Sequence, residues 1–501
     1  MHVYIDGTGL TKFGKSNLDL KSLLVEAGKK ALNQSRYPEP DAVFVGAMNP
    51  EEFTETGNIS TLTVDALGLS GIPSIRVETA SSSGAAVFSV AFTAVASGIF
   101  RNVLVIAGEK MTHLPTSRVT KILAEVIEPQ ERELGATMPA LAAMITKAYM
   151  NRYKISSDKM EHILSSIALK NHFNGSLNPY AQFQKRITIK EYKESKMIAE
   201  PLRLYDCSPI TDGAAALVLT KERTDIRVAG IGQGTDTLAL RHRDSITHFM
   251  ATRIAAKTAY EMGGLKPQDI NFAEVHDAFT SFEIINSEDL GFFEEGRGWE
   301  AVMDGVTHID GPLPINPSGG LKSRGHPVGA SGLAQVVETI RQMRGEVDSK
   351  CQVGKADIAL THSIGGIGNN NFVVILERVR ERIKPTRKTT GYNLPIHITR
   401  IKGPQDQEIK VDETEGFIET FTTLYVTPEG FPSPLILGLV KLKEQNTRII
   451  ARAMFLGKYK IGERVKVEKE DNLYLFRKEN ITEKLKYYFR SITRKLFKYI
   501  R

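Results

Sequence analysis

The chain has 501 residues, of which 41% are hydrophobic and 25% are charged, and its formal net charge is +7. The length predicts more than one domain, and the composition is that of a folded globular protein, which excludes extensive disorder. No stretch is long and apolar enough to indicate a membrane span, and the amino terminus lacks the basic start and apolar core of a signal peptide, so we expect a cytoplasmic protein.

Apolar runs typical of strands alternate with helical runs of small residues over residues 1–380, which predicts an α/β domain. The strand candidates are almost continuously apolar, as in strands buried on both faces, and they are residues 41–46, 103–107, 215–219, 358–361 and 372–376. Two predicted helices, residues 84–96 and 330–343, each begin at a glycine-rich corner and are each followed by a strand, which indicates an internal duplication. The polar segment 115–205 predicts an inserted helical subdomain in the first half.

Between the two halves, glycines occupy the alternate positions Gly230, Gly232 and Gly234. A glycine-rich run after a strand is a feature of dinucleotide-binding loops, but the full glycine spacing and the acidic residue for the ribose are missing. We therefore expect a turn that enters the second half, and no dinucleotide cofactor.

The composition changes after residue 380. Residues 381–393 are polar and basic, which predicts a linker, and residues 394–470 hold short alternating runs that predict a small all-β barrel or sandwich. Residues 471–501 form a tail in which seven basic residues and one acidic residue follow position 480. Most of the net charge therefore lies in the tail, and nothing indicates that the rest of the chain binds nucleic acid. Apolar residues recur at helical spacing in this tail, which indicates an amphipathic helix that either lies on an anionic membrane surface, as a peripheral contact, or packs on protein.

The clearest functional signal is the run Val77-Glu78-Thr79-Ala80-Ser81-Ser82-Ser83-Gly84, which ends an extended segment and opens a helix of small residues. Two histidines lie in short motifs farther along the chain, His276 in Val-His-Asp-Ala-Phe and His326 in Gly-His-Pro-Val-Gly. A histidine before proline at a glycine-rich helix start has a rigid backbone with N–H donors nearby, so His326 is a candidate base facing a bound carbonyl group. The alternative interpretations are that His-Pro is only a turn and that His276 is a core histidine paired with Asp277.

Residues 1–380 resemble the thiolase superfamily, specifically its sterol-carrier-protein-X type and archaeal acetyl-CoA acetyltransferases. The resemblance rests on the motifs above together with the longer run Gly319–Ala330 and the run Thr361-His362-Ser363-Ile364-Gly365-Gly366-Ile367-Gly368. The resemblance implies a duplicated α/β fold in αβαβα layers. Residues 1–225, with the 115–205 loop subdomain, would form the first half, and residues 226–380 the second. It also implies an acyl-CoA thioester as substrate, with no cofactor and no metal ion.

The resemblance assigns roles to the matching positions. The position that matches Ser81 holds the nucleophilic cysteine in thiolases. His326 matches the histidine that activates this nucleophile and helps to form an oxyanion hole. His276 matches the second element of that hole, and the N–H groups of Gly365 and Ser81 match a second oxyanion hole. His362, beside the usual position of an acid/base cysteine, is a candidate substitute for it.

The chain departs from this pattern wherever thiolases use sulfur. Ser81 replaces the nucleophile, Ser363 lies where many thiolases place an acid/base cysteine, and Ala278 replaces the cysteine of the His-Asp-Cys-Phe motif of the sterol-carrier type. Cys207 and Cys351 are too few for a disulfide framework and too far apart for a thiolate zinc cluster, and we expect both to be packing residues. Because a cysteine at a helix N-terminus beside a histidine is partly thiolate and a serine is not, we do not expect ordinary thiolysis.

Three functions stay open on this basis; the resemblance favours the first, and the retained histidines count against the third. The first is an acyl-CoA C-acyltransferase of the acetyl-CoA acetyltransferase type that uses Ser81 or no nucleophile, with His326 as base. The second is a thiolase-like retro-aldolase that acts on a β-hydroxyacyl-CoA and needs only a base and an enolate-stabilising hole. The third is a non-catalytic acyl-CoA-binding or scaffold subunit paired with an active thiolase.

Residues 416–469 resemble the OB-fold domain associated with acyl-CoA enzymes, without the four-cysteine zinc ribbon that often precedes it. The resemblance implies a homodimer or a larger assembly with a thiolase paralogue, an HMG-CoA synthase or a hydratase. An OB-fold can also bind nucleic acid, but fusion to a thiolase-like body favours acyl-CoA channelling or lyase assembly over nucleic-acid binding.

Overall fold

The computed structural model describes residues 2–379, 414–428, 430–443, 447–470 and 473–478. The predicted linker at residues 381–393 and the predicted amphipathic helix of the tail lie outside these described residues. Within the described residues, no helix is long and apolar enough to cross a membrane.

One mixed sheet of nine strands has the order β3-β2-β4-β7-β1-β8-β11-β10-β9. Its strands are β1 (Tyr4–Leu10), β2 (Ala42–Gly46), β3 (Ser74–Val77), β4 (Asn102–Glu109), β7 (Gly213–Thr220), β8 (Ile226–Thr235), β9 (Phe272–Glu274), β10 (Ile358–Gly365) and β11 (Asn370–Arg378). β1 and β8 pair through Tyr4 with Arg227 and Ile5 with Ile226 only. The sheet therefore consists of a five-stranded and a four-stranded unit that meet at a narrow seam.

The two units repeat one topology. In the first unit β2 and β4 are parallel and β7 and β1 follow antiparallel, and in the second unit β9 and β10 are parallel and β11 and β8 follow antiparallel. The five predicted strand segments correspond to β2, β4, β7, β10 and β11. These strand predictions and the predicted duplication are therefore confirmed.

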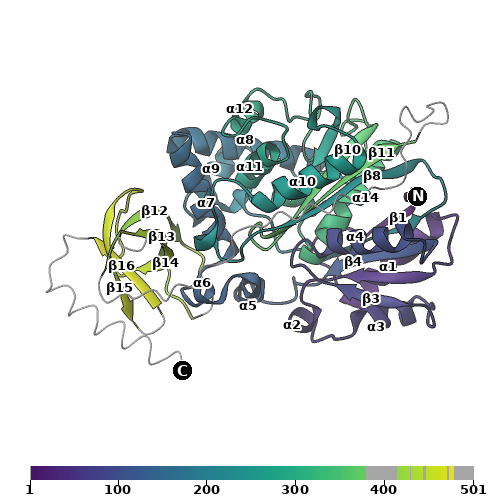
Figure 1. Ribbon diagram of the computed structural model, residues 1–501, viewed down its shortest axis with the longest axis horizontal. Helices are drawn as coiled ribbons and strands as arrows, with labels where there is room; N and C mark the ends of the chain where they lie inside the picture. Colours follow the sequence, from purple (N-terminus) through teal and green to yellow (C-terminus); the bar gives the residue numbers. More distant parts are fainter. Residues whose placement is uncertain (1, 380–413, 429, 444–446, 471–472, 479–501) are drawn as a thin grey trace.

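Helices form layers around the two sheet units (Figure 1). α4 (Ser83–Ala96) and α14 (Ser331–Arg344) lie between the units, since both pack in one core cluster with strands of both units. α1 (Leu20–Gln34) covers the outer face of the first unit, and α10 (Met250–Gly263) covers the outer face of the second. Successive side chains of a strand alternate between these clusters, as a pleated strand requires. The arrangement is the predicted αβαβα fold.

The alternate glycines of the second half lie within β8 and not in a turn, which corrects the prediction. A Cβ atom on Gly232 would overlap the carbonyl oxygen of Ala255 in α10, and β1 has the same arrangement, with Gly9 against Ala27 of α1. The glycines of the two strands that face helix backbone in this way are Gly7, Gly9, Gly230, Gly232 and Gly234. They let each outer helix lie directly on its strand, and their repetition further supports the duplication.

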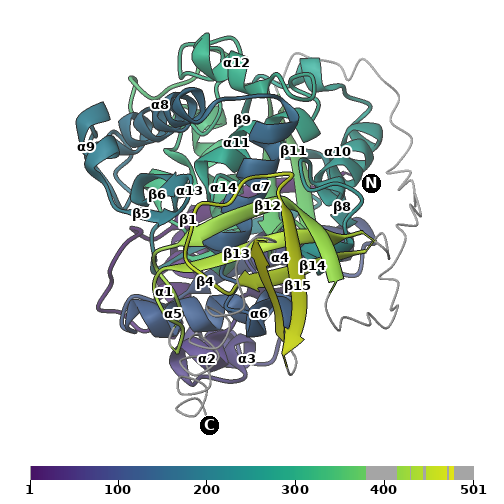
Figure 2. The same cartoon turned by 90° about the vertical axis from the view of Figure 1, so that its left-hand side faces the viewer.

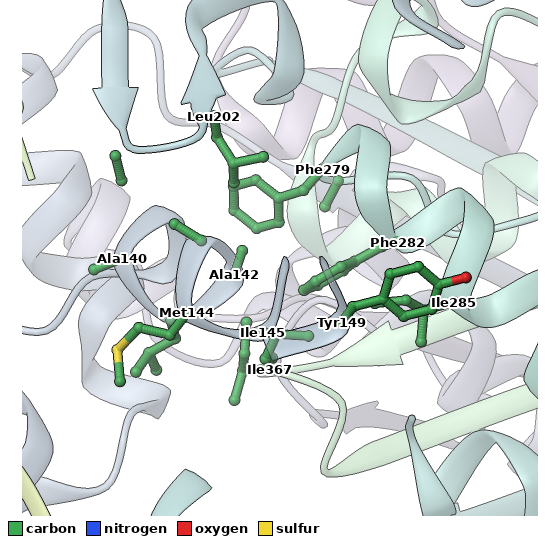
Figure 3. Packing of buried hydrophobic residues seen from close by; sticks show 14 of the residues in the cluster. Ala140, Ala142, Met144, Ile145, Tyr149, Leu202, Phe279, Phe282, Ile285 and Ile367 are labelled. Carbon is green, nitrogen blue, oxygen red and sulfur yellow. The ribbon is translucent and has the colours of Figure 1, made fainter. Parts of the chain in front are cut away.

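The segment predicted as a helical insertion does contain helices. They are α5 (Thr116–Leu123), α6 (Pro129–Glu133), α7 (Met138–Arg152), α8 (Ser157–Ser176) and α9 (Ile189–Glu194), followed by the short strands β5 (Met197–Ala199) and β6 (Leu202–Arg203). Side chains of α7, among them Ile145 and Tyr149, pack with Phe282 of α11 and with Ile367 in one apolar cluster (Figure 3). The other helices are α2 (Pro50–Thr54), α3 (Ile59–Ala66), α11 (Thr280–Asp289), α12 (Gly298–Met303) and α13 (Gly320–Arg324).

The C-terminal strands form a small closed barrel. They are β12 (Thr414–Leu424), β13 (Leu435–Leu442), β14 (Arg448–Ala453), β15 (Arg464–Glu470) and β16 (Leu473–Lys478). The order β12-β13-β14-β16-β15 closes on β12, and only β14 and β16 are parallel among these pairs. β16 lies beyond residue 470, so the barrel continues into the segment predicted as tail. Phe476 of β16 packs in the core of the barrel, which makes this strand part of the barrel.

The barrel is docked on the inserted helices, with β12 and β13 in front of α7 in Figure 2. The hydroxyl of Thr420 donates to the carbonyl oxygen of Met144 at 2.7 Å, and the ammonium group of Lys147 lies 3.8 Å from the ring centre of Phe421. β12 also pairs with β5, so one sheet continues from the barrel into the body. Backbone pairing, a cation–π contact and a shared apolar cluster therefore hold the barrel in place.

Candidate active site

The Ser81 corner connects β3 to α4 through a constrained backbone. Ala80 has a φ of 57°, a left-handed conformation that residues with a Cβ rarely adopt, and the hydroxyl of Ser83 donates to the Ala80 carbonyl at 2.6 Å. This turn directs Ser81 toward the end of β10, where its hydroxyl donates to the carbonyl oxygen of Ile364 at 2.9 Å. Ser81 is 7% exposed, so this bond forms out of bulk solvent.

His276 follows β9 and faces the same end of β10. Its Nδ1 accepts a hydrogen bond from the N–H of Ile364 at 3.2 Å, which places the ring proton on Nε2. Asn286 in α11 donates its amide to the His276 carbonyl at 3.2 Å and so fixes the backbone of this residue. Burial, followed by the charges of His326 and other cationic groups, holds the pKa of His276 well below its usual value. His276 is therefore a neutral imidazole with an Nε2–H donor.

His326 lies between α13 and the start of α14. Its N–H donates to the hydroxyl of Thr211 at 2.9 Å, and its Nδ1 lies 2.7 Å from the hydroxyl of Ser331. Ser331 also donates to the carbonyl oxygen of Pro327, so it accepts from Nδ1–H of His326 and leaves Nε2 with a free lone pair. Burial, and then the charge of Arg324, lowers the pKa of His326 to about 3. This ring can accept a proton at Nε2.

The two imidazoles lie edge to face. The ring centres of His276 and His326 are 5.2 Å apart with an interplanar angle of 89°. An imidazole with an Nε2–H donor thus lies next to an imidazole with an Nε2 lone pair. A proton acceptor beside a neutral donor is what is needed to remove a proton from a bound substrate and stabilise the oxyanion that results.

Gly365 ends β10 against the Ser81 corner. A Cβ atom at this position would lie 2.5 Å from the carbonyl oxygen of Thr79 and 2.5 Å from the hydroxyl oxygen of Ser82. Only glycine therefore allows the strand to approach the corner this closely. The geometry fits the predicted close backbone approach, while the predicted role of the Gly365 N–H in a second oxyanion hole stays a prediction.

His362 is not brought to Ser81. Side chains alternate along β10, and His362 faces α10, where its Nε2 lies 3.0 Å from the hydroxyl of Thr252. Burial lowers the pKa of His362 to about 3. Ser363 faces the other way, toward Gly332 of α14, and its hydroxyl has no hydrogen-bond partner among the described residues. Neither side chain has a contact that would make it an acid/base partner of Ser81.

Neither cysteine of the chain can take the place of the missing nucleophilic thiolate. Burial raises the pKa of Cys207 to about 12 and that of Cys351 to about 11, so both are thiols at neutral pH. The thiol of Cys351 contacts the carbonyl oxygen of Asn174 at 3.5 Å. Ala278 is buried in the apolar cluster of α7 and α11. In the part of the chain that the structure describes, no group of three or more His, Cys, Asp or Glu side chains is placed to hold a metal ion.

Sequence reasoning missed the residues that hold the two histidines in place, one through a ring nitrogen and two through the backbone. These are Ser331 and Thr211 around His326, and Asn286 behind His276. Ser331 has a readable signal, because it lies at the start of α14 five residues after His326. Thr211 and Asn286 come from distant segments and have no local signal.

Comparison with known proteins places these features in a family. The family described as "Thiolase, N-terminal domain" matches residues 3–223, and "Thiolase C-terminal domain-like" matches residues 232–378. An acetyl-CoA acetyltransferase of Methanothermobacter thermautotrophicus is 41% identical over 389 residues, which are 75% of this chain and 99% of that protein. A protein of Thauera aromatica named "Benzoylsuccinyl-CoA thiolase subunit BbsB" is 34% identical over 377 residues, which are 73% of this chain and 94% of that protein.

Solved structures share the fold at lower identity. The "Ltp2-ChsH2(DUF35) aldolase" has a TM-score of 0.63 at 24% identity and covers 76% of this chain and 98% of its own. A monomeric SCP2-thiolase-like protein type 1 of Mycobacterium smegmatis has a TM-score of 0.71 at 14% identity and covers 95% of this chain and 98% of its own.

Proposed function

Because the chain belongs to the thiolase family, we propose that it acts on acyl-CoA thioesters and cleaves or forms the carbon–carbon bond next to their carbonyl group, as a retro-aldolase of a β-hydroxyacyl-CoA. The reaction proceeds through a thioester enolate and forms no acyl-enzyme at residue 81. Coenzyme A enters as part of the substrate, and no cofactor or metal ion takes part.

The observation that carries this proposal is the hydrogen bond of Ser81. Its hydroxyl donates to the Ile364 carbonyl, so its proton points away from a base, and the Nε2 lone pair of His326 is left for the substrate. A serine used as nucleophile needs that proton to face a general base. Aldol chemistry needs only the base and a donor for the enolate oxygen, and His326 and His276 supply these two groups.

The steps balance without a further reactant. Nε2 of His326 takes the proton of the substrate β-hydroxyl group as the Cα–Cβ bond breaks and a carbonyl product forms. The bonding electrons move into the thioester as an enolate, whose oxygen accepts from Nε2–H of His276. The protonated His326 then returns its proton to Cα, which yields the shortened acyl-CoA and restores the site.

A second candidate is acyl transfer of the acetyl-CoA acetyltransferase type, by way of an acyl-Ser81 or without a covalent intermediate. The relatives favour it, since two archaeal proteins that are 41% and 37% identical have that name. An acyl-serine ester is a poorer acyl donor to a carbanion than a thioester, which is why we place this candidate second. The third candidate, a scaffold subunit, is supported by the relative named as a thiolase subunit.

We further propose that the protein is cytoplasmic and works as an assembly. The strand order of the barrel, with a single parallel pair between β14 and β16, supports an OB-fold. The end strand β3 exposes a sheet edge to which a second copy can pair, which supports a homodimer. A thiolase paralogue, an HMG-CoA synthase or a hydratase are further partners consistent with an acyl-CoA substrate.

The test is product analysis with a β-hydroxyacyl-CoA and, separately, a β-ketoacyl-CoA plus coenzyme A. We expect an aldehyde or ketone and a shortened acyl-CoA in equal amounts from the first substrate, with a loss of at least about a hundredfold in His326→Asn. Thiolysis of the second substrate together with an acyl adduct on Ser81 in the intact-protein mass would replace this proposal by the second candidate. Binding of both substrates without any product would replace it by the third.

A further inference from the structure

Arg243 is a buried cation that forms no ion pair among the described residues. It ends the short turn Leu240–His242 and is 1% exposed. Its Nη1 donates to the carbonyl oxygen of Ile367 at 2.9 Å, while its Nε and Nη2 have no hydrogen-bond partner among the described residues. Nε and Nη2 form one side of the guanidinium fork, which is the side that grips a planar carboxylate with two parallel hydrogen bonds.

Two carboxylates lie near Arg243 without pairing with it, and Oε2 of one of them, Glu131, has no hydrogen-bond partner among the described residues. Oε1 of Glu131 accepts from the backbone N–H of Arg241 at 3.3 Å and from its Nη1 at 3.4 Å, and Oδ1 of Asp236 accepts from the N–H of Thr237 at 2.7 Å. Both carboxylates act on the pKa of Arg243 through space, and neither forms an ion pair with it. Burial of donors without partners costs free energy, so an edge of this kind is expected to have an occupant.

The protein fixes the direction of this edge. Arg448 of the barrel donates its Nη1 to the Arg243 carbonyl at 2.9 Å, and the bond to Ile367 holds one end of the guanidinium. The backbone and one nitrogen are thus pinned, and the Nε/Nη2 edge stays open. A pre-oriented fork loses less conformational entropy when it binds than a mobile surface arginine does.

The edge lies within reach of the candidate active site. Ile367 comes three residues after Ile364, whose carbonyl accepts the Ser81 hydroxyl. Three residues of extended chain span at most about 10 Å, so the backbone that Ser81 contacts and the backbone that Arg243 contacts lie within about 10 Å of each other. One segment, residues 364–367, thus contacts both the Ser81 hydroxyl and the buried Arg243 guanidinium.

We propose that the Nε/Nη2 edge of Arg243 binds a carboxylate at the far end of the acyl group, so that the substrates are acyl-CoA thioesters with a second, free carboxylate. This inference rests on the proposed acyl-CoA function and narrows its substrate class. The carboxylate supplies the acceptors that the buried fork lacks, and the adjacent Ile367 loop sets its distance from the thioester.

The test compares carbon-matched CoA thioesters by isothermal titration calorimetry, namely succinyl- against butyryl-CoA, glutaryl- against valeryl-CoA and adipyl- against hexanoyl-CoA. We expect at least one carboxylated member to bind about tenfold to a hundredfold more tightly than its neutral partner, the range for hydrogen bonds to a charged group. Arg243→Met should abolish that preference and leave the affinity for the neutral esters unchanged. Arg243→Lys should keep only part of it, since lysine has no fork.

Arg452 provides the matched control. It also joins the barrel to the body, but its Nε and Nη2 already donate to the Leu134 carbonyl, so Arg452→Met should retain the preference. Equal affinities within all three pairs for the wild-type protein would overturn the inference, whether or not Arg243→Met folds. A preference that survives in Arg243→Met, or is lost in Arg452→Met, would also overturn it. If the neutral esters do not bind either, the proposed acyl-CoA function itself fails.

Discussion

At the residue scale, two neutral imidazoles are assigned opposite tasks by the hydrogen bonds that their Nδ1 atoms make. Nδ1 of His276 accepts from a backbone N–H, and Nδ1 of His326 donates to the Ser331 hydroxyl. The remaining nitrogens are therefore a donor and an acceptor, with no change in charge. Burial makes this arrangement robust because it disfavours the doubly protonated ring of either histidine.

The low pKa of His326 leads to a prediction for the pH profile. Its pKa is about 3, below the ordinary value of 6.5, so the ring stays an unprotonated base as the pH falls through 6.5. We expect kcat/KM for cleavage of a β-hydroxyacyl-CoA to change less than about threefold between pH 5 and pH 8. A sigmoidal loss with a midpoint near the ordinary histidine pKa would contradict the assigned base. The affinity for butyryl-CoA over the same range is the control for loss of the fold.

Unlike the activity, the stability of the fold should depend on pH in this range. The folded pKa values of His326 and His362 lie at about 3, whereas the unfolded chain titrates near 6.5, so the unfolded state binds more protons between these values. The free energy of unfolding therefore falls as the pH is lowered from 6.5 toward 3. Because His362 makes no contact with Ser81, His362→Gln should flatten this slope in urea titrations while its activity persists. An unchanged slope would contradict the assignment of His362 as a buried neutral residue.

At the element scale, the distance between an outer helix and its strand is set by glycines. Gly232 of β8 faces the backbone of α10, with no room for a Cβ atom. Gly232→Ala is therefore expected to destabilise the fold by about 3 kcal/mol or more, because backbone on backbone cannot repack as side chains do. Gly57→Ala, at a position with open space, is the control and should change the urea midpoint little. Equal effects of the two substitutions would contradict this packing.

The same elements show which parts of the fold the sequence predicts. The apolar strands of the sheet units and the two helices α4 and α14 were predictable, because burial on both faces leaves an almost continuous apolar run. The glycines of β8 were misread as a turn, since only the position of α10 explains them. β16 was missed although it forms a hairpin with β15 directly before it in the sequence; only its parallel partner β14 lies farther away.

The candidate site was predictable only in part. Ser81, His276 and His326 lie in recognisable motifs, and the structure brings them to one end of β10. His362 could not be placed from the sequence, because the side of β10 that it faces depends on the register of the strand and on the helix that covers it. Arg243 had no signal at all, since its importance comes from partners that the fold fails to provide.

At the scale of the whole molecule, the two ends of the large sheet differ. At one end, Ala273 of β9 forms a bridge with Ile315, which covers part of that edge. At the other end, β3 has Ile75 at 43% exposure. Pairing of two β3 strands about a twofold axis would extend the sheet and cover this side chain. We expect light scattering to give about twice 55.5 kDa for the wild-type protein. Ile75→Lys should shift it toward the monomer, and a wild-type monomer at micromolar concentration would contradict the pairing.

The most direct test of the enolate account is solvent deuterium exchange at Cα of a non-cleavable acyl-CoA, followed by NMR. Reversible protonation of the enolate by His326 predicts exchange in the wild-type protein and in Ser81→Ala at rates within about threefold of each other. His326→Asn should abolish it. Exchange that is lost in Ser81→Ala, or absent from a wild-type protein that binds the acyl-CoA, would contradict the account.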